Sequence, residues 1–202
     1  VQAFWHPDGQ SLLYIDKPGP DQPAGLWSVD LNAGPPVLYT EKVGLYSKDM
    51  QYRAFLSGEV TSIERLADGQ TWPILNDGRA VVFSPDGEWL AWTAGQSGPP
   101  FDSARREIWA GRVDGSQARP LLPLYSGGVI DWFPDGRLLL VSGRIDPSAV
   151  DQSLFSLAFD PDSQPAPIDE LLQTGRLNLL AQGNRVRGAS LSPDGGYLAY
   201  QI

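Results

Sequence analysis

The sequence has 202 residues, of which 42% are apolar, and its 24 acidic and 15 basic side chains give a formal charge of −9. The acidic balance argues against a nucleic-acid partner, which would need clustered Lys and Arg. The absence of cysteine excludes disulfides and thiolate metal sites, and no apolar run approaches the roughly 20 residues of a membrane helix.

The first predicted element is a β-hairpin whose two strands flank Pro7, Asp8 and Gly9. Proline presets φ for a tight turn, aspartate can bond back to backbone amides, and glycine tolerates the positive φ of the bulge that follows. The same order of strand, turn and apolar strand occurs five times. The second copy has lost both the proline and the glycine. The turn aspartates of the five copies are Asp8, Asp49, Asp86, Asp135 and Asp194.

Successive turn aspartates lie 41, 37, 49 and 59 residues apart. A repeat of about 40 to 50 residues is typical of a propeller blade or a helical solenoid unit. Period-two alternation, aromatic residues and frequent Gly and Pro favour strands over helices. The sequence therefore predicts an all-β fold, a β-propeller of four-stranded antiparallel blades with about four complete blades and a partial fifth.

We expect one propeller domain over residues 1–202, divided into repeats at about 1–41, 42–78, 79–125, 126–184 and an incomplete 185–202. The expected later strands of the first three repeats are 26–31, 37–39, 60–66, 72–75, 108–113 and 121–122. In the fourth repeat a third strand at 154–159 is followed by two open alternatives: a helical turn at 168–173, or a fourth strand at 177–181. The fifth repeat has strands only at 189–192 and 197–202. This count predicts a fragment of a longer propeller.

Several motifs resemble those of the TolB-like, WD40-like (PD40) propeller repeat family. They are Ser84-Pro85-Asp86-Gly87, Leu90-Ala91-Trp92, Ile108-Trp109 and Val113-Asp114-Gly115. The resemblance implies a propeller of six or seven blades. It also implies either a periplasmic protein-docking module or the propeller that precedes the hydrolase domain of a prolyl-oligopeptidase-like serine peptidase.

No motif in the sequence predicts catalysis. A serine hydrolase would need a glycine-x-serine-x-glycine elbow, which is absent. The single histidine, His6, occupies a turn position and has no sequence-predicted triad partner. The turn aspartates lie on separate blades and each has a local structural role, and Asp160 and Asp162 are too few ligands for calcium. We therefore expect no catalytic residue, no cofactor and no metal.

The loops of such blades divide between two faces. Turns joining strands one to two and three to four carry most of the aspartates, whereas the longer Gly- and Pro-rich links lie on the opposite face with most of the arginines. Binding usually resides on long loops held by a rigid scaffold. The predicted partner-binding face is that of the long links, with Lys17, Arg79, Arg105, Arg106, Arg144, Arg185 and Arg187.

The leading hypothesis is a non-enzymatic scaffold that binds a protein or peptide through the long-looped face, in a bacterial extracytoplasmic compartment, periplasmic or at the cell surface. A cytoplasmic location is the alternative, since a chain without cysteine fits both. The alternative is the gating, substrate-filtering propeller of a prolyl-oligopeptidase-like peptidase whose hydrolase domain is absent from this chain. A polysaccharide binder that uses tryptophans is a third, weaker hypothesis, because blade packing already explains their number.

Overall fold

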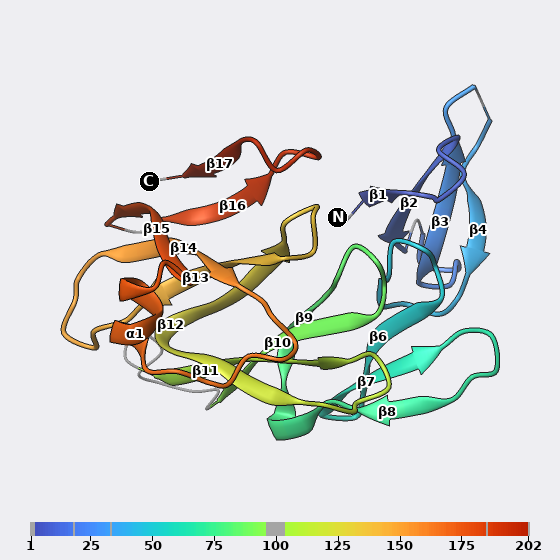
Figure 1. Cartoon of the computed structure of the whole chain (residues 1–202). Helices are drawn as coiled ribbons and strands as arrows, with labels where there is room; N and C mark the ends of the chain where they lie inside the picture. The colour runs from blue at the N-terminus through green and yellow to red at the C-terminus, as the bar shows by residue number, and fades with distance from the viewer. Residues whose placement is uncertain (1–2, 18, 33, 96–103, 185, 202) are drawn as a thin grey trace.

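The computed structural model describes residues 3–17, 19–32, 34–95, 104–184 and 186–201 of the chain. These residues form antiparallel β-sheets that follow one another in chain order along an arc (Figure 1). The first sheet contains β1 (Ala3–Trp5), β2 (Ser11–Asp16), β3 (Gly25–Asp30) and β4 (Val37–Thr40). The second contains β5 (Leu45–Tyr46), β6 (Tyr52–Ser57), β7 (Val60–Arg65) and β8 (Thr71–Pro73).

One long strand, β12, joins the third and fourth four-stranded units into a single seven-stranded sheet. Its first part pairs with β11 and its second part with β13, and the strand bends at Ser126 and Gly127, where φ is 51° and 125°. The seven strands are β9 (Arg79–Phe83), β10 (Trp89–Gly95), β11 (Arg105–Arg112), β12 (Arg119–Trp132), β13 (Leu138–Arg144), β14 (Gln152–Ala158) and β15 (Leu177–Gly183).

The last sheet has two strands, β16 (Arg187–Leu191) and β17 (Leu198–Gln201). The described chain thus has the architecture of part of a β-propeller, with four four-stranded units and a two-stranded fifth, and the predicted fold class is confirmed. Its only α-helix, α1 (Ile168–Gln173), has six residues, so no helix of the described chain could span a membrane.

Three sequence-based details differ from the structure. The strand predicted at 72–75 ends at Pro73, and a 3₁₀ turn, η1 (Leu75–Asp77), follows, in which Asn76 has a φ of 58°. The strand predicted at 121–122 is part of the much longer β12, because the chain bends at Gly127 without leaving the sheet. The two alternatives for the fourth unit both occur, since α1 precedes β15.

All five repeated turns have the same backbone hydrogen bonds. In the third copy, Gly87 N donates to Ser84 O at 3.0 Å and Ser84 N donates to Trp89 O at 2.9 Å. The second copy forms the same pair of bonds although Met50 stands in the place of the glycine, with a φ of 57°. The turn aspartate accepts a hydrogen bond from the amide two residues later in every copy. This local chemistry explains the repetition of the aspartates.

The core lies between neighbouring sheets. On β10, Trp89 and Ala91 face the cluster shared with β13 and β14, whereas Leu90, Trp92 and Ala94 face the cluster shared with β6 and β7. Both faces of this strand are therefore buried, which explains its nearly continuous apolar sequence. Face-to-face packing of this kind gives the rigid scaffold on which the loops are placed.

Candidate functional site

We call the end of the sheets that carries the repeated Pro-Asp-Gly-type turns the turn end, and the opposite end the link end. Because every strand pairing is antiparallel, the start of each first strand and the end of each second strand lie at the link end. This placement brings the described backbone of six of the seven predicted basic residues to the link end: Lys17, Arg79, Arg105, Arg106, Arg144 and Arg187. Arg185 lies outside the described residues, and for Arg187 only the backbone is described.

Two of these arginines bond to the backbone of the link end itself. Arg106 Nη1 donates to the carbonyl of Gly127 at 3.0 Å, at the bend of β12. Arg144 Nη1 donates to the carbonyl of Ala149 at 2.8 Å, within the loop from β13 to β14. Arg105 is different, because its side chain is 65% exposed and lies 3.6 Å from Glu107 Oε1. The group of predicted arginines therefore includes structural as well as accessible side chains.

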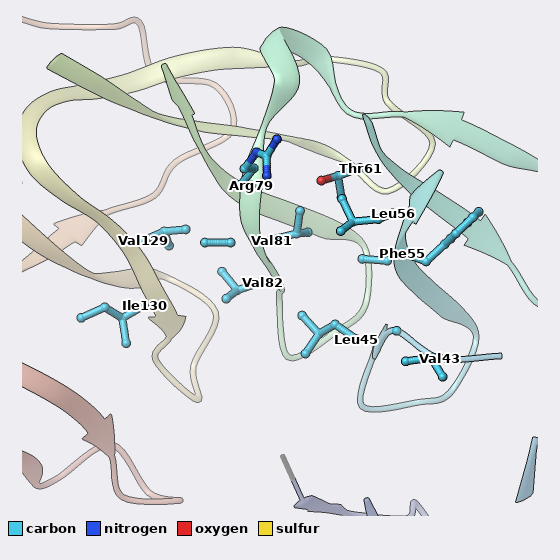
Figure 2. Close-up of a pocket in the computed structure, with 13 residues that line it drawn as sticks. Val43, Leu45, Phe55, Leu56, Thr61, Arg79, Val81, Val82, Val129 and Ile130 are labelled. Atoms are coloured by element: carbon cyan, nitrogen blue, oxygen red, sulfur yellow. The ribbon is translucent and has the colours of Figure 1, made fainter. Parts of the chain in front are cut away.

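An apolar depression of about 760 Å³ opens beside Arg79 (Figure 2). Its walls come from the link ends of strands of three units: β5, β6 and β7 on one side, the second part of β12 on the other, and β9 between them. Its lining residues are Val43, Gly44, Leu45, Ala54, Phe55, Leu56, Thr61, Arg79, Ala80, Val81, Val82, Val129 and Ile130. Arg79 is the only charged residue among them.

The depression combines a buried floor with an exposed rim. Val81 and Val129 are 5% and 6% exposed and form the floor, whereas Leu56 is 63% and Val43 is 39% exposed at the rim. Exposed apolar side chains grouped around a concavity indicate an interaction site more strongly than the same side chains scattered singly. A cation beside an apolar hollow can attract a carboxylate while the hollow receives an apolar side chain.

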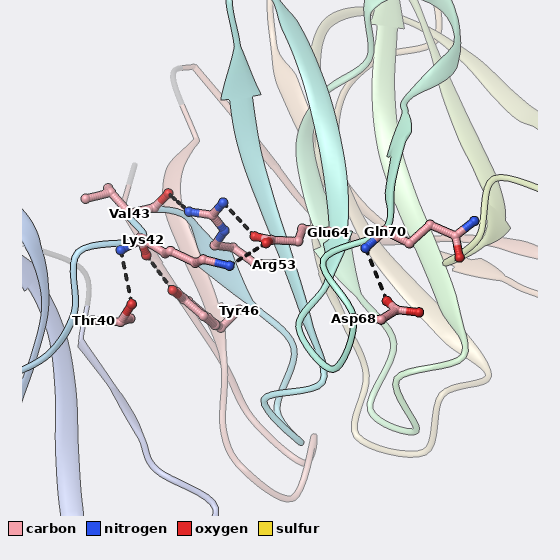
Figure 3. A network of polar contacts seen from close by, with 8 residues as sticks. All are labelled: Thr40, Lys42, Val43, Tyr46, Arg53, Glu64, Asp68 and Gln70. Atoms are coloured by element: carbon pink, nitrogen blue, oxygen red, sulfur yellow. Dashed lines mark hydrogen bonds and ion pairs between the residues drawn. The ribbon is translucent and has the colours of Figure 1, made fainter.

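An ionic network between β6, β7 and the link from β4 to β5 contacts the backbone of Val43, which lines the depression (Figure 3). Glu64 Oε1 is 2.5 Å from Lys42 Nζ, and Glu64 Oε2 is 2.6 Å from Arg53 Nη2. The side chains of Glu64 and Arg53 are only 8% and 10% exposed, whereas that of Lys42 is half exposed. One carboxylate therefore bridges two cations that come from different strands and links.

The network also shifts the protonation equilibria of its members. Burial alone would raise the pKa of Glu64, but the hydrogen bond from Lys42 and the charge of Arg53 outweigh it and hold this pKa below its usual value. Burial raises the pKa of Tyr46 to about 12, so its hydroxyl stays protonated and donates to the carbonyl of Lys42. The carboxyl group of Glu64 is therefore ionised at neutral pH.

His6, Asp160 and Asp162, for which the sequence predicts no catalytic or metal-binding role, make hydrogen bonds or ion pairs within turns. His6 Nδ1 lies 2.9 Å from Asp8 Oδ2 within one turn. Asp160 Oδ1 accepts from the amide of Asp162 at 2.9 Å, an ordinary turn contact. Among the described residues, no three His, Cys, Asp or Glu side chains are grouped so that they could hold a metal ion.

Sequence reasoning missed the apolar part of the site. Arg79 was predicted, but Val43, Leu45, Leu56 and Ile130 were not, because the last three belong to strands that also contribute to the core and Val43 lies in the link before β5. One signal was available: Leu56 stands two residues before Gly58, near the turn from β6 to β7. Its exposure could not be predicted without knowing how the units curve around the arc.

No family model matches the sequence, and no curated protein matches it. Solved structures do. TolB from Acinetobacter baumannii superposes with a TM-score of 0.65 at 18% identity, over 98% of this chain and 47% of that one. A protein assigned as TolB from Agrobacterium tumefaciens gives 0.59 at 17% identity, over 98% and 73%.

Dipeptidyl peptidase 4 from Porphyromonas gingivalis gives a TM-score of 0.56 at 12% identity, over 98% of this chain and 36% of that one. The chain thus spans about half of the Acinetobacter TolB and about a third of this peptidase. Identities this low show the fold and not the activity. The chain therefore has the TolB-like β-propeller fold, in the form of part of such a propeller.

Proposed function

We propose that this propeller is a non-enzymatic scaffold that binds a segment of a protein or peptide at its link end, in an extracytoplasmic compartment. The observation that carries the proposal is the depression beside Arg79, where three units converge and exposed apolar side chains surround a single cation. The fold likeness to TolB structures supports a propeller that needs no catalytic centre for its role.

The chemistry of the depression defines the expected occupant. Leu56 and Val43 offer apolar surface to one or two apolar side chains, and Arg79 offers a guanidinium to a carboxylate next to them. The inner edges of β5 and β9 border the same space, so an extended peptide could also pair with strand backbone. We expect a peptide in which an apolar residue neighbours an Asp, a Glu or the C-terminal carboxylate.

A display library of random peptides, selected on the immobilised protein, tests this proposal. Selected peptides should share an apolar residue beside a carboxylate. Their Kd, measured by fluorescence anisotropy, should rise at least about tenfold in Leu56→Asp and in Arg79→Glu, since each removes one charge-assisted or apolar contact. Arg137→Glu is the matched control, because this exposed arginine lies at the turn end. Equal affinity in all three variants would refute the assignment of the face.

The peptidase-propeller hypothesis remains the second candidate, on the likeness to dipeptidyl peptidase 4. It places the chain over a hydrolase domain, with the link-end or turn-end surface facing that domain. The coding sequence that follows Ile202 distinguishes the two: a hydrolase domain with a glycine-x-serine-x-glycine elbow would favour the peptidase. Further blade repeats followed by a stop codon would favour the scaffold.

A further inference from the structure

The segment from Glu41 to Gly44 joins the first sheet to the second and forms part of the rim of the depression. Val43 and Gly44 both line it. Gly44 lies so close to β6 that an added Cβ would collide with the carbonyl oxygen of Ala54. Small shifts of this segment therefore change the shape of the depression directly.

The ionic network holds this segment at both of its central residues. Tyr46 Oη donates to the carbonyl of Lys42, and Arg53 Nη1 donates to the carbonyl of Val43 at 3.1 Å. The ammonium of Lys42 is bound in turn by Glu64. Figure 3 shows the guanidinium of Arg53 between the Val43 carbonyl and the Glu64 carboxylate.

Glu64 is the member that contacts both cations. It fixes Arg53 through Nη2 at 2.6 Å, so that Nη1 is left aimed at Val43. The guanidinium also lies 4.3 Å from the centroid of the Phe55 ring, and Phe55 itself lines the depression. Removal of the carboxylate would leave two neighbouring cations uncompensated, which pushes them apart and frees the carbonyl of Val43.

We infer that Glu64 is a positioning residue of the depression: through Arg53 and Lys42 it sets the place of Val43 and Gly44, although it does not line the depression itself. The lowered pKa of Glu64 keeps this brace charged over the whole neutral range, so it acts as a permanent support. The inference rests on the proposed function only in taking the depression as the docking site.

Hydrogen–deuterium exchange of the whole chain tests the brace without any ligand. In Glu64→Gln, the amides of residues 42–45 should exchange about tenfold faster, while those of β10 and β13 keep their protection. Glu88→Gln is the control, since it breaks a pair of the same 2.6 Å length with Arg112 at the turn end, where both side chains are more exposed. If Glu64→Gln fails to fold, Lys42→Met, which removes the half-exposed partner, replaces it.

The second measurement is the affinity for 8-anilinonaphthalene-1-sulfonate, an apolar anion that fits a hollow beside an arginine. Its Kd should rise several-fold in Glu64→Gln, because residues that orient the groups lining a site affect binding even without touching the ligand. The Kd should stay unchanged in Glu88→Gln. Leu56→Asp should weaken the dye but leave the exchange of residues 42–45 unaltered. If Glu64→Gln accelerates exchange at residues 42–45 but leaves the Kd of the dye unchanged, the result counts against the proposed function and not against the positioning role. Unchanged exchange at 42–45, or a uniform acceleration over the whole chain, would overturn the positioning role.

Discussion

The hydroxyl of Ser84 donates to Asp86 Oδ1 at 2.5 Å, and Ser84 Oγ also accepts a hydrogen bond from the amide of Trp89 at 2.9 Å. One side chain thus closes the turn from both sides; the last copy repeats this arrangement and the first copy does not. In the first copy His6 takes the place of the serine, whereas Ser192 in the last copy repeats both contacts.

Replacement of Ser84 by alanine should lower the free energy of unfolding by about 1 to 3 kcal/mol, because the buried amide of Trp89 loses a partner. Ser192→Ala should cost clearly less, since its partner Tyr197 is 77% exposed and water can replace the hydroxyl. Urea denaturation of both variants gives the comparison. Equal losses would show that burial does not decide the cost.

Phe159 joins the cores of the third and fourth units. Its ring centroid lies 5.0 Å from those of Trp89 and of Trp132, in edge-to-face contact with both. Phe159→Ala should therefore destabilise the protein by about 3 to 5 kcal/mol, and Phe159→Leu by much less. Near-ultraviolet circular dichroism should show the loss of the tryptophan signal at a lower denaturant concentration. The control is Phe133→Leu, in the turn of the fourth repeat.

The bend of β12 depends on Gly127, whose φ is 125° and where an added Cβ would collide with the carbonyl oxygen of Ser142. Gly127→Ala should cost more than 2 kcal/mol, roughly the range of severe backbone substitutions. Gly69→Ala is a reference without the collision, since its φ of 73° is also positive but nothing lies within 4 Å. A loss of about 1 kcal/mol is expected there. Thermal unfolding of both variants measures the difference. Similar losses would refute the close approach as the cause.

The repeated turns could be predicted from the sequence because their chemistry is local: an aspartate that bonds the amide two residues later needs no distant partner. Even the degenerate copy at Met50 could be recognised from its position. The continuous path of β12 could not, since Pro123 and Gly127 normally interrupt strands, and only the pairing with β11 and β13 holds them in one. The depression depends on three units meeting, and Glu64 on two cations brought from different segments, so the sequence offers only Leu56 near a turn as a local signal for the depression and none for Glu64.

Two neighbouring arginines of the predicted binding face should behave differently. Arg106→Met should lower stability by about 1 kcal/mol, because its guanidinium bonds the carbonyl of Gly127 at the bend. Arg105→Met should change it by less than about 0.5 kcal/mol, since its contact with Glu107 is long and solvent-exposed. Arg105→Met should lower the affinity for a partner that binds the link end without lowering the stability of the protein. Denaturation curves of both variants decide whether Arg106 is structural.

Asp68 should titrate far below other carboxylates. The hydrogen bonds from Arg65, at 2.6 and 3.0 Å, together with that from the amide of Gln70, lower its pKa to about 2. Carbon-detected NMR of the carboxyl group should give this midpoint. In Arg65→Gln the pKa should return toward the usual value of about 3.9, whereas the remote Arg137→Gln should leave it unchanged.

The lowered pKa of Asp68 makes the free energy of unfolding depend on pH. Because the pKa of Asp68 is lower in the folded state, its contribution is fully present above about pH 4 and is lost as the pH falls through about 2. The stability difference between the natural chain and Arg65→Gln should therefore shrink between these pH values. It should also shrink in high salt, since the pair is exposed. A difference that stays constant from pH 6 to pH 2 would mean that Arg65 stabilises the turn by packing on Trp72, 5.4 Å from its ring centroid, and not by charge.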